Sequence, residues 1–79
     1  MPISTSVECV ATLWQLAWTD NSVLACCVYR DGAGRLELRV QSASALIVRE
    51  PFEIQPRAVA RAHALRESLK RSGWVDCQS

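Results

Sequence analysis

The sequence has no marked excess of charge of either sign. Nine lysine and arginine residues stand against eight aspartate and glutamate residues, which leaves a formal net charge of +1. A chain that binds nucleic acid through phosphate contacts usually carries a large basic excess, so this balance argues mildly against that function. The sequence also lacks a run of the roughly 20 apolar residues that span a bilayer, and no basic, apolar leader opens it. We therefore expect a cytoplasmic protein without a membrane partner.

The cysteines lack the Cys-x-x-Cys spacing of zinc ribbons and dithiol redox sites. They are Cys9, Cys26, Cys27 and Cys77. Cys26 and Cys27 are adjacent, and neighbouring side chains on a strand point to opposite faces, so these two cannot easily hold one ion together. We expect four reduced thiols that act as small hydrophobic side chains, with no metal and no cofactor.

The sequence also lacks a recognisable catalytic constellation. His63 is the only histidine, it falls at the border of an apolar helical stripe, and no nucleophile or carboxylate partner is identifiable for it. We interpret it as a partly buried structural residue. The segment Gly32–Gly34 is too short for a phosphate-binding loop and precedes a strand. Glu50 and Glu53 flank a proline in an expected surface turn, so we predict that the protein is not an enzyme.

Three segments in the middle of the chain predict strands. Residues 23–29 are apolar and favour β-structure on both faces. An Asp-Gly hairpin signal at residues 31–34 follows, and residues 35–41 then alternate strictly between apolar and polar side chains, as in a half-buried antiparallel strand. Residues 46–49 form the next candidate, which Pro51 ends or places at a sheet edge.

A helix is predicted over residues 56–72. Pro56 suits the first helical position, and basic residues in the last turn complement the helix dipole. Gly73 fits the left-handed position after the helix, with Trp74 packing back on Leu69. The apolar stripe consists of Ala58, Val59, Ala62, Leu65 and Leu69.

The amino-terminal segment supports two interpretations. Thr5 and Glu8 form a capping-box pattern, and apolar residues recur at helical spacing over residues 5–18. Trp14, Leu16 and Trp18 also alternate as they would in a strand. The pattern alone leaves both structures open.

Three segments follow one further pattern, in which a Trp-containing strand precedes more strands and a helix that begins with Arg-Ala. They are Leu13–Leu16, Cys27–Arg30 and Ile54–Ala60. In this pattern the chain from Thr12 onward resembles a group of short, uncharacterised proteobacterial proteins of about this length. The resemblance implies a four-stranded meander with a helix across one face, and it supplies no activity or functional residue. His63 stands where those proteins often have an aromatic residue.

We therefore predict a single α+β domain over residues 1–79. Four antiparallel strands form a meander, and the C-terminal helix packs on one face of it. The strands are expected at residues 11–18, 22–30, 35–42 and 45–53, with a frayed or extended segment at 1–10 and a tail at 75–79. The alternative fold replaces the first strand with a helix at 5–18, followed by three strands and the C-terminal helix.

Self-association is the function that the sequence favours. One helix can cover only one face of the sheet, yet both faces of the second strand are apolar. We expect a non-enzymatic cytoplasmic interaction module that forms a homodimer, the commonest symmetric assembly. Aromatic residues are frequent anchors of such interfaces. The candidate contact residues are Trp14, Trp18, Cys27 and Tyr29.

The alternative is a weak nucleic-acid-binding domain. Arg57, Arg61 and Arg71 lie away from the apolar stripe and form a basic helix face that suits an acidic protein partner or a phosphate backbone. Arg35, Arg39 and Arg49 could supply a charged sheet face, although Glu37 interrupts it. A merely solvated basic helix is the plainer interpretation, so we place nucleic acid second.

Overall fold

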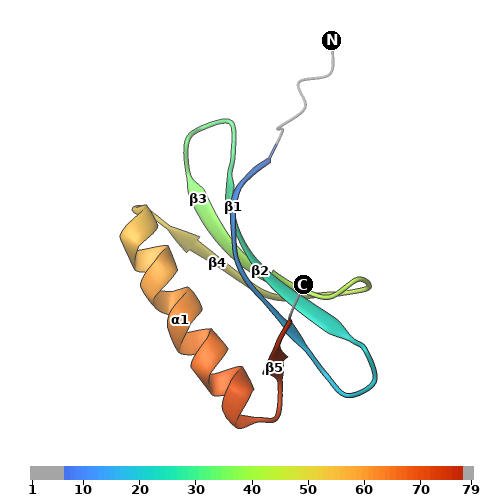
Figure 1. Ribbon diagram of the computed structural model, residues 1–79. Helices are drawn as coiled ribbons and strands as arrows, with labels where there is room; N and C mark the ends of the chain where they lie inside the picture. The colour runs from blue at the N-terminus through green and yellow to red at the C-terminus, as the bar shows by residue number, and fades with distance from the viewer. Residues whose placement is uncertain (1–6, 78–79) are drawn as a thin grey trace.

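The computed structural model describes residues 7–77 of the chain. Within these residues, five strands and one helix follow each other in the order β1 (Glu8–Ala17), β2 (Val23–Arg30), β3 (Leu36–Gln41), β4 (Leu46–Phe52), α1 (Gln55–Arg71) and β5 (Val75–Asp76). The strands form one antiparallel sheet in the order β4-β3-β2-β1-β5. Helix α1 lies across one face of this sheet (Figure 1). The predicted α+β fold is confirmed, and the alternative with an amino-terminal helix is wrong over residues 8–17.

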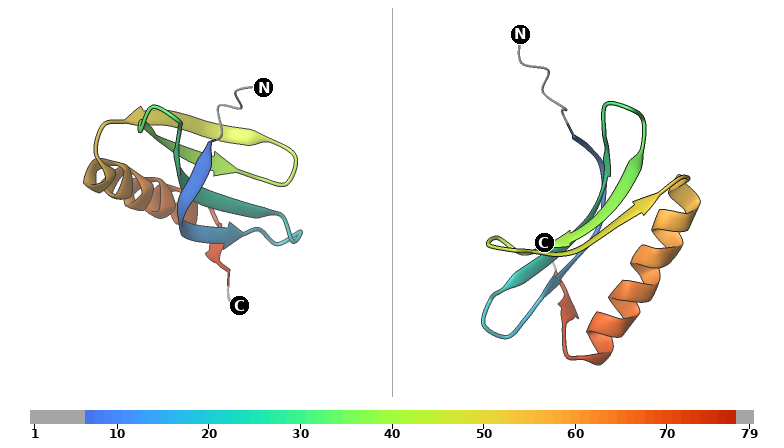
Figure 2. Two further views of the ribbon diagram at one scale, coloured as in Figure 1. Left: turned by 90° about the horizontal axis from the view of Figure 1, so that it is seen from above. Right: turned by 180° about the vertical axis from the view of Figure 1, so that it is seen from behind.

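The predicted four-stranded meander is roughly right, but a fifth short strand extends it. Figure 2 shows β1 to β4 as neighbours in the sheet, with α1 returning along one face. Residues 75–76, expected in a tail, form β5 and pair with Leu16 and Ala17 of β1. Strand β1 begins at Glu8, so residues 8–10 of the segment expected to be frayed or extended belong to the sheet. Thr5 of the capping-box pattern lies outside the described residues.

Two β-bulges in β1 explain why its sequence resembles a helix. The pairing of β1 with β2 skips one residue at Val10 and another at Leu13. Both skipped side chains pack against the core, together with Trp14 and Leu16, because each bulge resets which face the following residues reach. Apolar residues therefore recur at mixed spacings of two, three and four, which pattern analysis cannot separate from a helical period.

The core lies between the sheet and α1. On α1, Ala58 and Ala62 face it and are 0% and 1% exposed. These small side chains let the helix backbone approach so closely that the indole Nε1 of Trp14 donates a hydrogen bond to the carbonyl oxygen of Ala62, at 2.8 Å. The bond satisfies the only polar side-chain atom of this buried tryptophan. The sheet side of the core consists of Trp14, Leu16, Leu24, Cys26, Val28, Leu36, Leu38 and Val40.

The end of α1 has the predicted glycine motif. Gly73 has a φ of 115°, its N–H donates to the carbonyl oxygen of Lys70, and the N–H of Trp74 donates to that of Leu69. These two bonds define a Schellman motif. The turn brings the ring of Trp74 to 5.1 Å from the ring of Trp18, between centroids. A Cβ on Gly73 would lie 2.9 Å from the Trp18 ring, so this position has no room for a side chain.

Ion pairs between Asp76 and two basic residues of α1 connect β5 to the helix. The carboxylate of Asp76 accepts hydrogen bonds from Arg66 at 2.7 Å and from Lys70 at 2.9 Å. Hydrogen bonds from Lys70 and Arg66 hold the pKa of Asp76 below its usual value. The basic residues near the helix end therefore hold the short fifth strand against α1, in addition to complementing the helix dipole.

Alanine substitution at each of the three glycines tests how strictly the position after α1 requires a glycine. Gly32 and Gly34, in the turn between β2 and β3, serve as comparisons for Gly73. A Cβ on Gly32 or Gly34 would meet nothing within 4 Å, and of these two only Gly34 has a positive φ, of 83°. We expect Gly32→Ala to change the free energy of unfolding little, Gly34→Ala to lower it by about 1 kcal/mol, and Gly73→Ala to lower it more. Urea unfolding followed by circular dichroism measures all three. Equal effects of Gly34→Ala and Gly73→Ala would show that the Trp18 ring does not restrict Gly73.

The Asp76 pairs predict a pH-dependent contribution to stability. Because the folded-state pKa of Asp76 is lowered, its contribution is present above about pH 4, the unfolded value, and is lost as the pH falls through the folded value. Asp76→Asn should therefore unfold at lower urea concentration than the wild type near neutral pH, with the difference shrinking below about pH 4. Glu53→Gln, at an exposed carboxylate, is the matched control. A difference that persists unchanged at low pH would contradict the role of the Asp76 charge.

Candidate functional site

Two of the four predicted self-association residues pack within the chain. Trp14 is 8% exposed and lies beneath α1, where it is part of the core. Trp18 is 37% exposed, but its ring packs against Trp74 and over Gly73 at the end of the helix. Both tryptophans thus connect the first strand to the helical layer of their own chain.

The other two predicted residues, Cys27 and Tyr29, lie on the opposite face of the sheet. Directly paired residues of neighbouring strands share a face, and Cys27 pairs with Thr12 on one side and Arg39 on the other. No helix or strand within residues 7–77 covers this side, as Figures 1 and 2 show. We call it the open face. Its members are Cys9, Thr12, Gln15, Ala17, Val23, Ala25, Cys27, Tyr29, Glu37, Arg39, Gln41, Leu46, Arg49 and Pro51.

One end of the open face carries a closed polar cluster. The carboxylate of Glu37 accepts hydrogen bonds from Arg39 and, at 2.8 Å, from Arg49. Burial acts to raise the pKa of Glu37, but the hydrogen bonds from Arg49 and Arg39 outweigh it and hold the pKa below its usual value. The Arg39 guanidinium also lies 4.5 Å from the centre of the Tyr29 ring, and Gln41 donates to the Tyr29 hydroxyl at 3.0 Å. Two guanidinium groups thus share one carboxylate, and the cluster keeps a net charge of +1.

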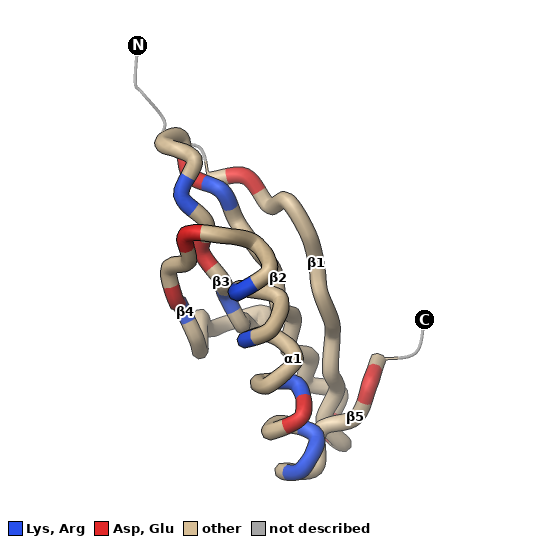
Figure 3. The backbone as a smooth tube through the Cα atoms, turned by 90° about the vertical axis from the view of Figure 1, so that its left-hand side faces the viewer, with Lys and Arg blue, Asp and Glu red and all other residues tan. Residues whose placement is uncertain are grey.

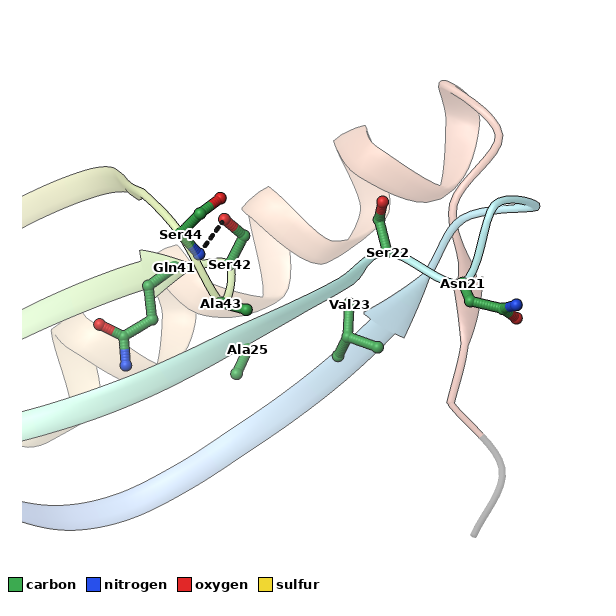
Figure 4. A pocket seen from close by; sticks show the side chains of 8 residues that line it. All are labelled: Asn21, Ser22, Val23, Ala25, Gln41, Ser42, Ala43 and Ser44. Carbon is green, nitrogen blue, oxygen red and sulfur yellow. Dashed lines mark hydrogen bonds between the residues drawn. The ribbon is translucent and has the colours of Figure 1, made fainter.

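The other end of the open face is apolar and uncharged. Val23 is 42% exposed and Leu46 is 48% exposed, and the side chains of Val23, Ala25 and Gln41 project on the same side of the sheet (Figure 4). A hollow of about 490 Å³ opens here between the two hairpin turns. None of the open-face residues of β1 and β2 is charged.

Cys27 is buried although it lies on the open face. It is 6% exposed, and its thiol lies 3.6 Å from the hydroxyl of Thr12. Burial raises the pKa of the Cys27 thiol, to which the neighbouring thiol of Cys9 also contributes. Burial likewise raises the pKa of Cys26, on the core face, to about 12. Both thiols are held in the neutral form, which behaves as a small hydrophobic group.

Of the three residues of the predicted basic helix face, one pairs with an acidic side chain. Arg61 bonds to Glu50 of β4 at 3.2 Å, and Arg71 donates to the carbonyl oxygen of Glu67 at 3.3 Å. Arg57 is exposed and forms no ion pair within residues 7–77. Figure 3 shows basic and acidic positions interspersed along the tube rather than gathered on one surface. Arg57 and Arg71 therefore carry positive charge without a carboxylate partner within residues 7–77.

Catalytic and metal-binding groups do not converge in the part of the chain that the structure describes. His63 is exposed on α1, so its interpretation as a partly buried residue is wrong. Among residues 7–77, no three histidine, cysteine, aspartate or glutamate side chains gather in a group that could hold a metal ion. Within the same range, no helix has the length and apolar character needed to cross a membrane.

Comparison of the chain with protein-family models, with curated proteins and with solved structures found no match. The resemblance to short proteobacterial proteins therefore stays a prediction. The open face is the feature that no helix or strand among the described residues 7–77 covers. Its apolar half could be anticipated from the two apolar faces of the second strand, but the part that Leu46 plays in it depends on a bulge in β4.

The burial of the thiols predicts a defined order of modification. Cys9 is exposed, Cys77 is half-buried, and Cys26 and Cys27 are buried. Because only exposed thiolates react readily, we expect a thiol reagent to modify Cys9 first, Cys77 more slowly, and Cys26 and Cys27 only after unfolding. Mass spectrometry of the labelled native and denatured chains identifies each site. Fewer than four modified cysteines after denaturation without reductant would contradict the prediction of free thiols.

Proposed function

We propose that the chain is a non-enzymatic cytoplasmic interaction module that associates with a second copy of itself. The observation that supports this proposal is the open face, half of which is apolar or uncharged. An antiparallel sheet with one face on the core normally turns a polar face to water. Here Val23 and Leu46 are each more than 40% exposed on that side. A surface of this kind is typical of a contact with another protein.

The four free cysteines fit the cytoplasmic part of the proposal. A reducing compartment keeps thiols unpaired, and the two most buried of them, Cys26 and Cys27, contribute to packing as neutral groups. Neither lies in a constellation suited to catalysis or to metal binding. The thiols are therefore assigned a structural role in this proposal.

Nucleic-acid binding stands second because three of its candidate contacts already have carboxylate partners, and only Arg57 and Arg71 of the helix face have none within residues 7–77. Arg61 is paired with Glu50, and Arg39 and Arg49 share Glu37. Phosphate contacts at these positions would compete with hydrogen bonds inside the chain. A gel shift with random duplex and single-stranded DNA at low and moderate salt tests this alternative, because phosphate contacts weaken steeply as salt rises.

The proposed function predicts a dimer in solution. Sedimentation at micromolar concentration should give about twice the mass of one chain, whereas a monomer at high concentration would refute the proposal. Trp18→Ala should mainly lower the stability of each chain, because the Trp18 ring packs on Trp74 and Gly73. A folded Trp18→Ala monomer with wild-type stability would instead place Trp18 at the contact between copies.

A further inference from the structure

We infer that the second copy packs sheet against sheet on the open face and does not extend the sheet at an edge. This inference rests on the proposed self-association and names the surface that carries it. Two observations lead to it. Both sheet edges have features that oppose strand addition, and the charge pattern of the open face suits a partner surface like itself.

The edge formed by β1 is partly covered and irregular. Strand β5 pairs with Leu16 and Ala17, and the N–H of Cys77 donates to the carbonyl oxygen of Gln15 at 3.0 Å. Beyond these residues, β1 contains the bulges at Val10 and Leu13. Bulges interrupt the regular row of N–H and C=O groups that an added strand needs.

The edge formed by β4 is also unsuited to strand addition. Its register with β3 shifts next to Gln41, where Ile47 is the additional residue. Pro51 has no N–H to donate, and the side chain of Glu50 is tied to Arg61 of α1. Charged residues, proline and a bulge are the devices by which edge strands avoid pairing with another chain.

The open face carries few charges that could select a strongly charged partner. Its charged residues are confined to the cluster of Glu37, Arg39 and Arg49, where two guanidinium groups share one carboxylate, which leaves an excess of one positive charge at this end of the face. The β1 and β2 side of the face is neutral. Because the excess positive charge lies at the polar end, the uncharged β1 and β2 sides of two such faces can approach without repulsion, whereas a highly acidic or basic partner would meet few charges. A second copy therefore satisfies the charge pattern.

The size and position of the face suit a twofold contact between two sheets. Strands spaced about 4.8 Å apart, with about 3.3 Å per residue, make the four-stranded part about 20 Å wide and about 23 Å long. This corresponds to a modest interface by the standards of stable complexes. Ala25 lies on β2, the central strand of the order β4-β3-β2-β1-β5, where its small side chain allows close approach.

Two exposed valines provide a matched test of the surface. Val23 lies on the open face and is 42% exposed, whereas Val75 lies on β5 and is 59% exposed. Val23→Lys should convert the dimer to a folded monomer at concentrations where wild type and Val75→Lys remain dimeric. Sedimentation gives the mass, and circular dichroism with urea unfolding establishes that each variant is folded. Leu46→Lys is the second open-face variant if Val23→Lys does not fold.

Native thiols provide a measurement that needs no variant. Cys9 lies on the open face, whereas Cys77 lies beside β5. Raising the concentration of the wild-type chain through its dissociation constant should slow modification of Cys9 several-fold and leave the rate at Cys77 unchanged. A wild-type monomer would refute the proposed function itself. A dimer in which Val23→Lys and Leu46→Lys are folded and still dimeric, or in which Cys9 is not protected, would overturn the open-face interface alone.

Discussion

A single helix covers only one of the two faces of the sheet, and most features of this protein follow from that constraint. Helix α1 can approach the sheet closely because Ala58 and Ala62 face it, and the bond from the Trp14 indole to the Ala62 carbonyl depends on this short approach. The core is consequently concentrated on one side. On the other side the strands must present their remaining side chains without a covering element from residues 7–77.

Contacts at the end of the helix connect α1 to β5 and to the residue that follows β1. Gly73 allows the turn, the rings of Trp18 and Trp74 pack together, and Asp76 is held by Arg66 and Lys70. These contacts fasten β5 beside β1. Arg66 and Lys70 of the helix thus have structural partners inside the chain, which reduces their availability for phosphate, and the open face remains the candidate site.

Several elements could be predicted because their patterns are local. Residues 35–41 alternate strictly, and β3 lies there; Pro56 and Gly73 frame the helix. Residues 8–17 could not be assigned from pattern, because bulges at Val10 and Leu13 mix strand and helix spacing. The β5 strand was missed because two residues carry no periodic signal, and their pairing depends on a strand almost sixty positions earlier.

For the candidate site, the order of residues determined that β2 has two apolar faces, and the composition determined that charge is balanced over the chain. The sequence also determined which residues suit turns, which can form ion pairs and which can pack in a core. Only the tertiary structure decided that Trp14 and Trp18 belong to the helical side while Cys27 and Tyr29 belong to the open face. The reason is physical: the face that a side chain reaches depends on bulges and register, and these are set by pairing between segments distant in sequence.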